Sequence, residues 1–207
     1  MRPELPLTFD LLEIIYILAR YKTNHITTMK ILKRILLVIV ILIAIPLIIA
    51  LFTKKDYAVE REIVINKPKQ EVFDYIKFIK NQDNYSVWNM KDPNSKKTYK
   101  GEDGTAGFIY GWESTNKEVG TGEQEIVKIV DGDRVDMQLR FKVPFEAEDD
   151  AYMVTEDAGA GATKVKWGFK GSLKYPFNLF LLVMDMDKEL GGALDQGLSN
   201  LKGIMEK

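Results

Sequence analysis

A run of 18 uncharged residues, Ile35 to Phe52, constrains this chain more than any other feature of its sequence. Fifteen of the 18 are Leu, Ile, Val or Phe. A helix of that length rises about 27 Å, close to the roughly 30 Å hydrocarbon core of a bilayer. Lysines and arginines flank the run on both sides. The run therefore predicts one membrane anchor over residues 29–56, with residues 35–52 in contact with lipid.

Two other readings of the run are less favourable. A buried core helix usually keeps a polar stripe, and this run has none on any face. A cleaved signal peptide has the same basic start, but the run is longer than a typical signal core and Leu47–Thr53 offers no small-x-small cleavage site. Because the chain has no cysteine, a lipidated cysteine anchor is excluded. An uncleaved single-pass anchor is the favoured interpretation.

Flanking charge gives the orientation only weakly, because equal numbers of Lys and Arg lie on the two sides of the run. The nearest charges favour a cytoplasmic amino terminus and an extracytoplasmic carboxy-terminal domain. Residues 1–28 form an amino-terminal extension with two open readings. Phe9 to Leu18 could lie in the membrane interface as an amphipathic turn or two, or Met29 could be the true start, so that the extension is not native.

Residues 57–207 are long enough for one domain with a sizeable core. They carry 21 Lys and Arg against 26 Asp and Glu, a net charge near −5. Nucleic-acid binding needs a basic patch, so this balance argues against a nucleic-acid partner and against broad adhesion to anionic lipid.

Period-two alternation predicts a mostly antiparallel sheet. Tyr57 to Ile65 reads as a first strand, followed by one or two short helices and a polar, turn-rich loop over Asn81 to Lys97. Alternation then returns around Phe108–Trp112, in Val135–Val143 and in Thr163–Phe169. Glycine-containing turns separate these strands, which favours hairpins and one water-facing side of the sheet.

The chain ends in a predicted amphipathic helix from Asn178 to Met205. Gly191, Gly192 and Gly197 interrupt it, and each costs about 1 kcal/mol relative to alanine. Either the helix bends at the glycine pair, or it leaves room for something beside it.

The predicted sheet of six or seven strands is roughly 30 Å wide, and one helix is only about 10–12 Å across. The sheet must therefore curl around the helix, which tends to leave a cavity. Inward strand residues, the helix stripe and one loop tryptophan are the candidate ligand-binding residues: Trp88, Tyr110, Trp112, Met137, Leu139, Phe141, Met153, Trp167, Met186 and Leu190.

Several phrases of the sequence resemble a known superfamily. They are VEREIVINK from Val59, PKQEVFDYI from Pro68, GTAGFIYGWES from Gly104 and GTGEQEIVKIVDGDRV from Gly120. In wording and order they resemble the START-like, or SRPBCC, superfamily, in particular bacterial members of its polyketide cyclase/dehydrase and lipid-transport group, several of which carry an amino-terminal membrane segment.

The resemblance implies an α+β helix-grip fold over residues 57–207, with a curved antiparallel sheet around the long carboxy-terminal helix. It also implies a cavity for a sterol-like, polyketide, quinone or lipid molecule, and a location at the bacterial inner membrane. It implies no reaction, because the superfamily includes carriers, cyclases, receptors and chaperone activators.

The residues themselves offer little catalytic chemistry. Residues 57–207 contain no histidine and no cysteine, so no zinc site, Rieske centre or Ser-His or Cys-His pair can be assembled, and no cofactor is expected. GEDGTAG, from Gly101 to Gly107, lacks the Gly-Lys-Ser/Thr ending of a phosphate loop. The acidic cluster Glu146, Glu148, Asp149 and Asp150 matches no calcium loop and predicts a solvated strand edge or hairpin.

The leading functional hypothesis is a membrane-tethered domain that binds a hydrophobic small molecule or lipid in an internal cavity. A cyclase or dehydratase acting on a polyketide-like substrate is the first alternative, and it needs a proton donor or acceptor in the cavity, such as Tyr110, Tyr152 or a carboxylate. A stress-response or protein-interaction domain with a filled core is the second.

Overall fold

The structure is a computed structural model that describes residues 11–207, so the predicted interfacial segment begins two residues outside that range. The chain divides into two compact units at Phe52/Thr53, and each is described by itself. The first unit is one helix, α1 (Leu11–Phe52). It continues without a break through the region predicted as a turn or two, because no glycine and no proline occur between Pro6 and Pro46.

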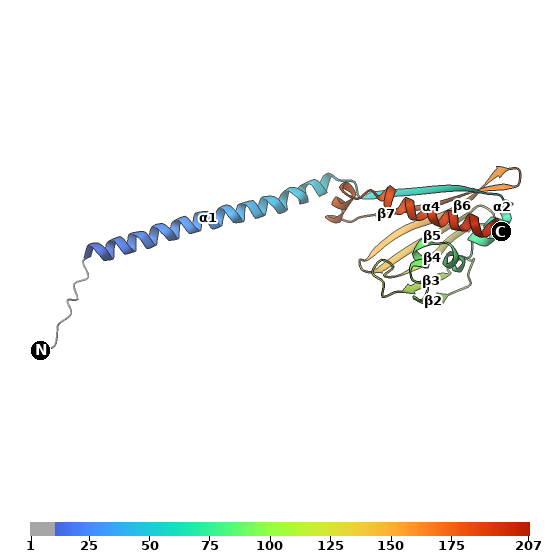
Figure 1. Ribbon diagram of the computed structural model, residues 1–207, viewed down its shortest axis with the longest axis horizontal. Coiled ribbons are helices and arrows are strands. Elements are labelled where there is room, and N and C mark those ends of the chain that lie inside the picture. The colour runs from blue at the N-terminus through green and yellow to red at the C-terminus, as the bar shows by residue number, and fades with distance from the viewer. Residues whose placement is uncertain (1–10) are drawn as a thin grey trace. The chain divides into compact units, whose positions relative to one another are not determined.

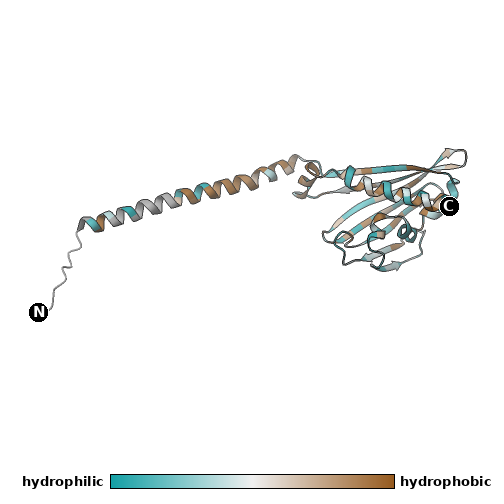
Figure 2. Ribbon diagram, viewed as in Figure 1, coloured by the Kyte–Doolittle hydropathy of each residue, from teal (hydrophilic) through white to brown (hydrophobic). Residues whose placement is uncertain are grey.

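The second half of α1 has the length and composition of a membrane span. Met29–Phe52 is 24 residues long, an 18-residue window within it has a mean hydropathy of 3.5, and the side chains of that window are almost all exposed. Figure 2 shows the apolar colour along this half of the helix. Pro46 lies inside the helix, as membrane-spanning helices tolerate.

The second unit contains a seven-stranded antiparallel sheet with the strand order β1-β7-β6-β5-β4-β3-β2 (Figure 1). This curved sheet and its long carboxy-terminal helix confirm the predicted α+β helix-grip fold. The strands are β1 (Asp56–Ile65), β2 (Lys96–Lys100), β3 (Ile109–Glu113), β4 (Thr121–Val130), β5 (Arg134–Val143), β6 (Ala147–Gly159) and β7 (Ala162–Ser172).

Alternation decides which side of each strand is buried. Val135 and Met137 of β5 point into the core, as do Val165 and Trp167 of β7. The opposite side carries ion pairs; Arg140, for example, contacts two carboxylates of β4, at 2.8 and 2.7 Å. Register shifts between β4 and β5 occur at Thr121/Gly122 and at Ile126/Lys128. Such bulges bend a sheet, which curves this one.

The short helix α2 (Lys69–Ile76) follows β1, as predicted. Two more short helices, η1 (Ile79–Asn84) and α3 (Val87–Lys91), occupy much of the segment predicted as a polar loop over Asn81–Lys97, and β2 begins at Lys96. Trp88 therefore lies on a helix rather than on a loop. Tyr85, between η1 and α3, is fully buried, and its ring meets that of Trp167 edge-on at 5.6 Å. Tertiary packing of this kind gives a polar segment its helical turns, which propensity alone does not predict.

The carboxy-terminal helix begins later than predicted. α4 spans Met186–Met205, and the 3-10 helix η2 (Phe177–Leu182) precedes it. Asp185 caps α4 by accepting a hydrogen bond from the Lys188 amide at 3.2 Å, which fixes its start. α4 packs mainly on β1, an edge strand of the sheet.

Two of the four glycines in α4 leave room for side chains from the sheet. A Cβ at Gly197 would lie 2.7 Å from Cζ3 of Trp167, and a Cβ at Gly191 would meet the guanidinium of Arg61. Arg61 binds Asp187 and Asp195 of the helix. Around Gly192 nothing lies within 4 Å. Close approach of side chains from the sheet, rather than a bend in the helix, therefore explains Gly191 and Gly197.

Candidate functional site: an aromatic cavity beside α3

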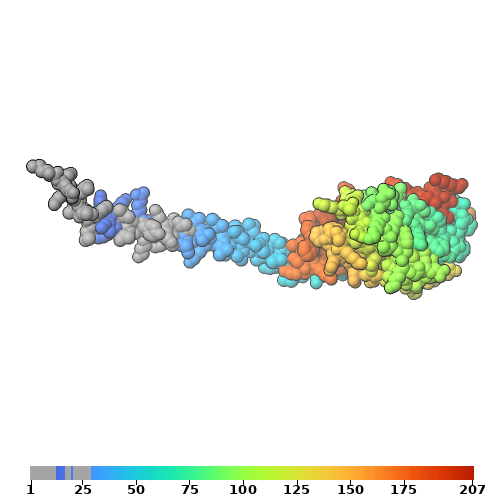
Figure 3. Space-filling model, turned by 90° about the horizontal axis from the view of Figure 1, so that it is seen from below, coloured from blue at the N-terminus to red at the C-terminus, as the bar shows by residue number. Residues whose placement is uncertain are grey.

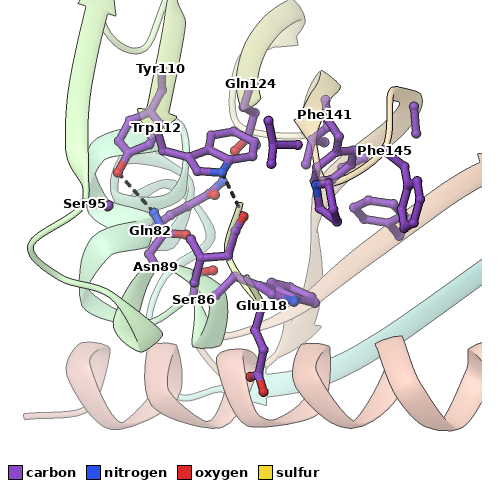
Figure 4. A pocket seen from close by; sticks show the side chains of 18 of the residues that line it. Gln82, Ser86, Asn89, Ser95, Tyr110, Trp112, Glu118, Gln124, Phe141 and Phe145 are labelled. Carbon is purple, nitrogen blue, oxygen red and sulfur yellow. Dashed lines mark hydrogen bonds between the residues drawn. The ribbon is translucent and has the colours of Figure 1, made fainter. Parts of the chain in front are cut away.

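A cavity of about 280 Å³ lies between the middle of the sheet, η1, α3 and two loops (Figure 4). Its volume is near the lower end of the roughly 300–1,000 Å³ typical of small-molecule sites. Most of its wall is apolar, formed by Trp88, Trp112, Val119, Leu139, Phe141, Val143, Pro144, Phe145, Ala147, Ala151, Trp167 and Phe169.

The indole of Trp112 forms a fixed part of this wall. Its ring lies over Gly122, where a Cβ would be 2.6 Å from Cζ2, so the cross-strand glycine makes the space for it. Its Nε1 donates to the Val119 carbonyl at 3.2 Å, and its ring meets that of Phe141 edge-on at 5.9 Å. These contacts hold an apolar surface open to the cavity, with the polar end of the indole already satisfied.

All three tryptophans of the chain line the cavity. Trp88, from α3, and Trp167, from β7, meet edge-on with their centroids 6.2 Å apart. A bound molecule would therefore change the intrinsic fluorescence of every tryptophan in the protein.

The structure brings six of the ten predicted site residues to the cavity: Trp88, Tyr110, Trp112, Leu139, Phe141 and Trp167. The other four, Met137, Met153, Met186 and Leu190, do not line it, so their prediction as lining residues is corrected. The sulfurs of Met137 and Met153 lie in the packed core, where they accept hydrogen bonds from Gln82, Gln124 and Tyr85.

Met186 and Leu190 miss the cavity because of where α4 lies. The helix packs mainly on β1, whereas the cavity is built on β3 to β7. The part of the apolar stripe that faces the sheet, Leu194, Leu198 and Leu201, is fully packed. The cavity is thus covered by η1 and α3. The prediction that the long helix covers it was wrong.

Beside the aromatic wall, Tyr110 belongs to a polar network centred on Asp83. The Tyr110 hydroxyl and the Asn89 amide donate to Oδ1 of Asp83 at 2.7 and 2.8 Å, and Lys97 Nζ donates to Oδ2 at 2.7 Å. Figure 4 shows the further contact between Asn89 and Tyr110, at 3.3 Å.

This network fixes the charge of its members. Burial raises the pKa of Asp83, but the hydrogen bonds from Lys97, Tyr110 and Asn89 outweigh it, so that pKa lies below its usual value. Burial, and then the hydrogen bond to Asp83, raise the pKa of Tyr110 far above its usual value. Asp83 is therefore a carboxylate and Tyr110 a neutral phenol at physiological pH, and neither is poised to exchange a proton near neutrality.

Three further polar side chains of the cavity were not predicted. Gln82, Ser86 and Gln124 are only 4, 2 and 7 % exposed. The two carboxamide nitrogens donate only to the sulfur of Met137, at 3.6 and 2.8 Å, and a thioether is a weak acceptor. Within residues 11–207, neither carboxamide oxygen nor the Ser86 hydroxyl has a hydrogen-bond partner.

The sequence held a signal for only one of these three. Gln124 stands between Gly122 and Ile126 in the alternation of β4, at a position that must face inward. Gln82 and Ser86 lie in the segment predicted as a polar loop, and only its folding into η1 and α3 buries them. In Figure 4, Gln82 and Ser86 lie on one side of the pocket and Phe141 and Phe145 on the other.

The charged residues of the cavity wall are confined to its mouth. Lys117 and Glu118 are exposed, and Glu118 pairs with Lys91 outside the wall at 2.8 Å. Phe145, which also lines the cavity, is 77 % exposed. The inner cavity therefore offers apolar surface and neutral hydrogen-bonding groups.

Neither a protein-family profile nor a curated protein sequence matches this chain. Solved structures do match its fold. Norcoclaurine synthase from Thalictrum flavum aligns with a TM-score of 0.55 at 9 % identity, covering 73 % of this chain and 94 % of that one. Ara h 8.0201 aligns with a TM-score of 0.53 at 15 % identity, covering 72 % and 97 %.

A third match, the major latex-like protein 151 of Panax ginseng, has a TM-score of 0.52 at 14 % identity and covers 73 % of this chain and 98 % of its own. At such low identity the likeness concerns the fold alone. The carboxy-terminal unit of this chain thus shares its helix-grip fold with these solved structures.

Proposed function

We propose that the protein is a membrane-tethered binding domain for a compact hydrophobic molecule that carries one neutral polar group. The observation that carries this proposal is the cavity beside α3. Most of its wall is apolar, and among its polar side chains Gln82, Ser86 and Gln124 have oxygens without a hydrogen-bond partner within residues 11–207. A ligand that supplies the missing partner gains a net hydrogen bond there, which contributes about 0.5–1.5 kcal/mol.

The lining favours a particular class of ligand. Two carboxamides and a hydroxyl both donate and accept, which suits a hydroxyl or carbonyl group on the ligand. An anionic group would meet no cationic side chain in the inner cavity. A volume near 280 Å³ suits one compact ring system or a single chain rather than a whole two-chain phospholipid.

The apolar half of α1 supports the tether. Hydrophobic molecules concentrate in bilayers, and a domain held at the bilayer surface meets them at a raised effective concentration. The cavity also weighs against the filled-core alternative.

The enzyme alternative has less support, because its candidate acids and bases are badly placed. Tyr110 is held as a neutral phenol. Tyr152 has its pKa raised to about 12 by burial and by Glu60, and it lies outside the cavity wall.

Binding can be tested on the full chain in lipid nanodiscs with 2-naphthol, whose uptake is followed by quenching of the three cavity tryptophans. Ala151→Leu adds three carbons inside the cavity and should weaken 2-naphthol binding about tenfold or more, since 1.4 kcal/mol is a factor of ten. The matched control is Ala58→Leu on the exposed side of β1, which should bind like the unmodified protein. Equal binding by both variants would overturn the proposal.

The polar part of the proposal has its own test. Gln124→Leu should weaken 2-naphthol binding about five- to tenfold and leave naphthalene binding unchanged, because only the hydroxyl uses the carboxamide. Gln196→Leu, on the exposed side of α4, is the control. If 2-naphthoate binds the unmodified protein more tightly than 2-naphthol does, the ligand class is wrong.

A further inference from the structure

We infer that an exposed apolar segment after β7 rests on the surface of the bilayer that holds α1. The segment, Tyr175–Met184, contains η2 and is called the apolar foot here. This inference depends on the membrane-anchor part of the proposed function, and it is independent of the cavity.

The apolar foot exposes far more hydrophobic surface than a water-facing segment requires. Val183 is 82 % exposed, and the rings of Phe177 and Phe180 stack against each other at 6.4 Å while remaining exposed. Soluble proteins rarely expose contiguous apolar patches larger than a few hundred Å² without a binding role. The exposed members are Tyr175, Phe177, Phe180, Leu182, Val183 and Met184.

Hydrogen bonds tie the foot, and the chain just before it, to the residues that follow the apolar helix. The buried Asn178 donates from Nδ2 to the Thr53 carbonyl at 2.9 Å, and the Leu173 amide donates to the Lys55 carbonyl at 2.9 Å. Thr53 directly follows Phe52, the last residue of the apolar half of α1. Consecutive Cα atoms are 3.8 Å apart, so the foot lies within roughly 10 Å of the point where the chain leaves the bilayer.

The composition of the foot fits a lipid surface. Between Lys174 and Asp185 the sequence is YPFNLFLLVM, without a single charged residue and with three aromatic rings. Aromatic and aliphatic side chains of this kind insert into the headgroup boundary. The 3-10 backbone of η2 does not satisfy all of its polar groups internally, which suits the interface rather than the hydrocarbon core. Atoms of this region, orange in Figure 3, lie at one end of the domain.

The absence of cysteine from the sequence makes a labelling test direct. Single variants Val183→Cys in the foot, Leu42→Cys in α1 and Val127→Cys on β4 are each labelled with a polarity-sensitive fluorophore in the full chain. The protein is reconstituted into phosphatidylcholine vesicles that contain nitroxide-labelled lipid. All three native side chains are exposed, so the labels should not disturb folding.

We expect lipid quenching at positions 183 and 42 and none at position 127. If position 42 is quenched and position 183 is as unquenched as position 127, the foot is wrong and the anchor stands. If position 42 is not quenched, the anchor and the foot both fail. If the label at 183 is shielded only at high protein-to-lipid ratios and without lipid quenching, a second copy of the chain covers the foot and the inference is overturned.

Discussion

At the scale of single residues, Asp149 shows how packing changes the chemistry of a side chain. It belongs to the acidic cluster predicted as a solvated edge, but it is only 7 % exposed and faces the Tyr57 hydroxyl at 3.4 Å. Burial raises the pKa of Asp149, and hydrogen bonds from the Ser172 backbone and Tyr57 reverse only part of that shift. The prediction of a solvated cluster is therefore wrong at this one position, because β6 turns Asp149 to the inner side of the sheet.

The raised pKa of Asp149 predicts a pH-dependent loss of stability. The folded state binds this proton more tightly than the unfolded state does, so stability falls as pH rises from about 3.8, the ordinary aspartate value, to the raised pKa. Asp149→Asn cannot ionise, so it should be more stable than the unmodified protein at pH 7, and the difference should vanish at pH 3.8 and below. Urea midpoints for the two proteins across this pH range measure the effect.

The neighbouring Asp150 provides the control. It lies on the exposed side of the same strand, so Asp150→Asn should show no comparable pH-dependent gain. An Asp149→Asn variant that is less stable at pH 7 than at pH 4, relative to the unmodified protein, would contradict the assignment.

At the scale of elements, α4 depends on one glycine to approach the sheet. Gly197→Ala would gain about 1 kcal/mol of helix propensity but would place a Cβ 2.7 Å from Trp167. Overpacking costs about 1–3 kcal/mol, and the ring it displaces also lines the cavity. We expect a net loss of about 1–2 kcal/mol of stability and weaker ligand binding, measured by denaturant unfolding and tryptophan quenching.

Gly192→Ala is the matched substitution in the same helix. Nothing lies within 4 Å of a Cβ there, so the propensity gain should stand alone and stabilise the domain by about 0.5–1 kcal/mol. Two variants that change stability equally would show that packing against Trp167 does not matter.

Sequence patterns predicted the strands but not the short helices η1 and α3, and the reason is where the buried face of each element comes from. Strands β5 and β7 follow from strict alternation, because each must bury one face and wet the other. The helices η1 and α3 did not follow from any pattern, since their polar residues are buried only through contacts with distant strands. Gln82 and Ser86 were missed with them.

At the scale of the whole molecule, the apolar half of α1 predicts where the protein resides. Leu42→Arg together with Ile45→Arg places two charges near the centre of the run, each costing about 2.5–3.5 kcal/mol. The combined cost of the two charges offsets most of the favourable insertion free energy, which is several kcal/mol. The double variant should therefore leave the membrane fraction. Sedimentation of membranes after alkaline extraction would detect this loss.

Val127→Arg adds a charge to the exposed side of β4 and should remain in the membrane fraction. Full retention of the double variant would mean that the run is not the anchor.

The sequence by itself determined the apolar helix, the antiparallel sheet and the carboxy-terminal helix, because each follows from how often a hydrophobic side chain recurs along the chain. It also identified most of the aromatic wall, from Tyr110 to Trp167. Only the tertiary structure decided that α4 packs on the edge strand β1 and that the cavity lies under α3. It alone buries Gln82 and Ser86, and brings them to the same cavity as Gln124. Periodicity states which face of an element is buried, but what that face is buried against depends on contacts between residues far apart in the chain.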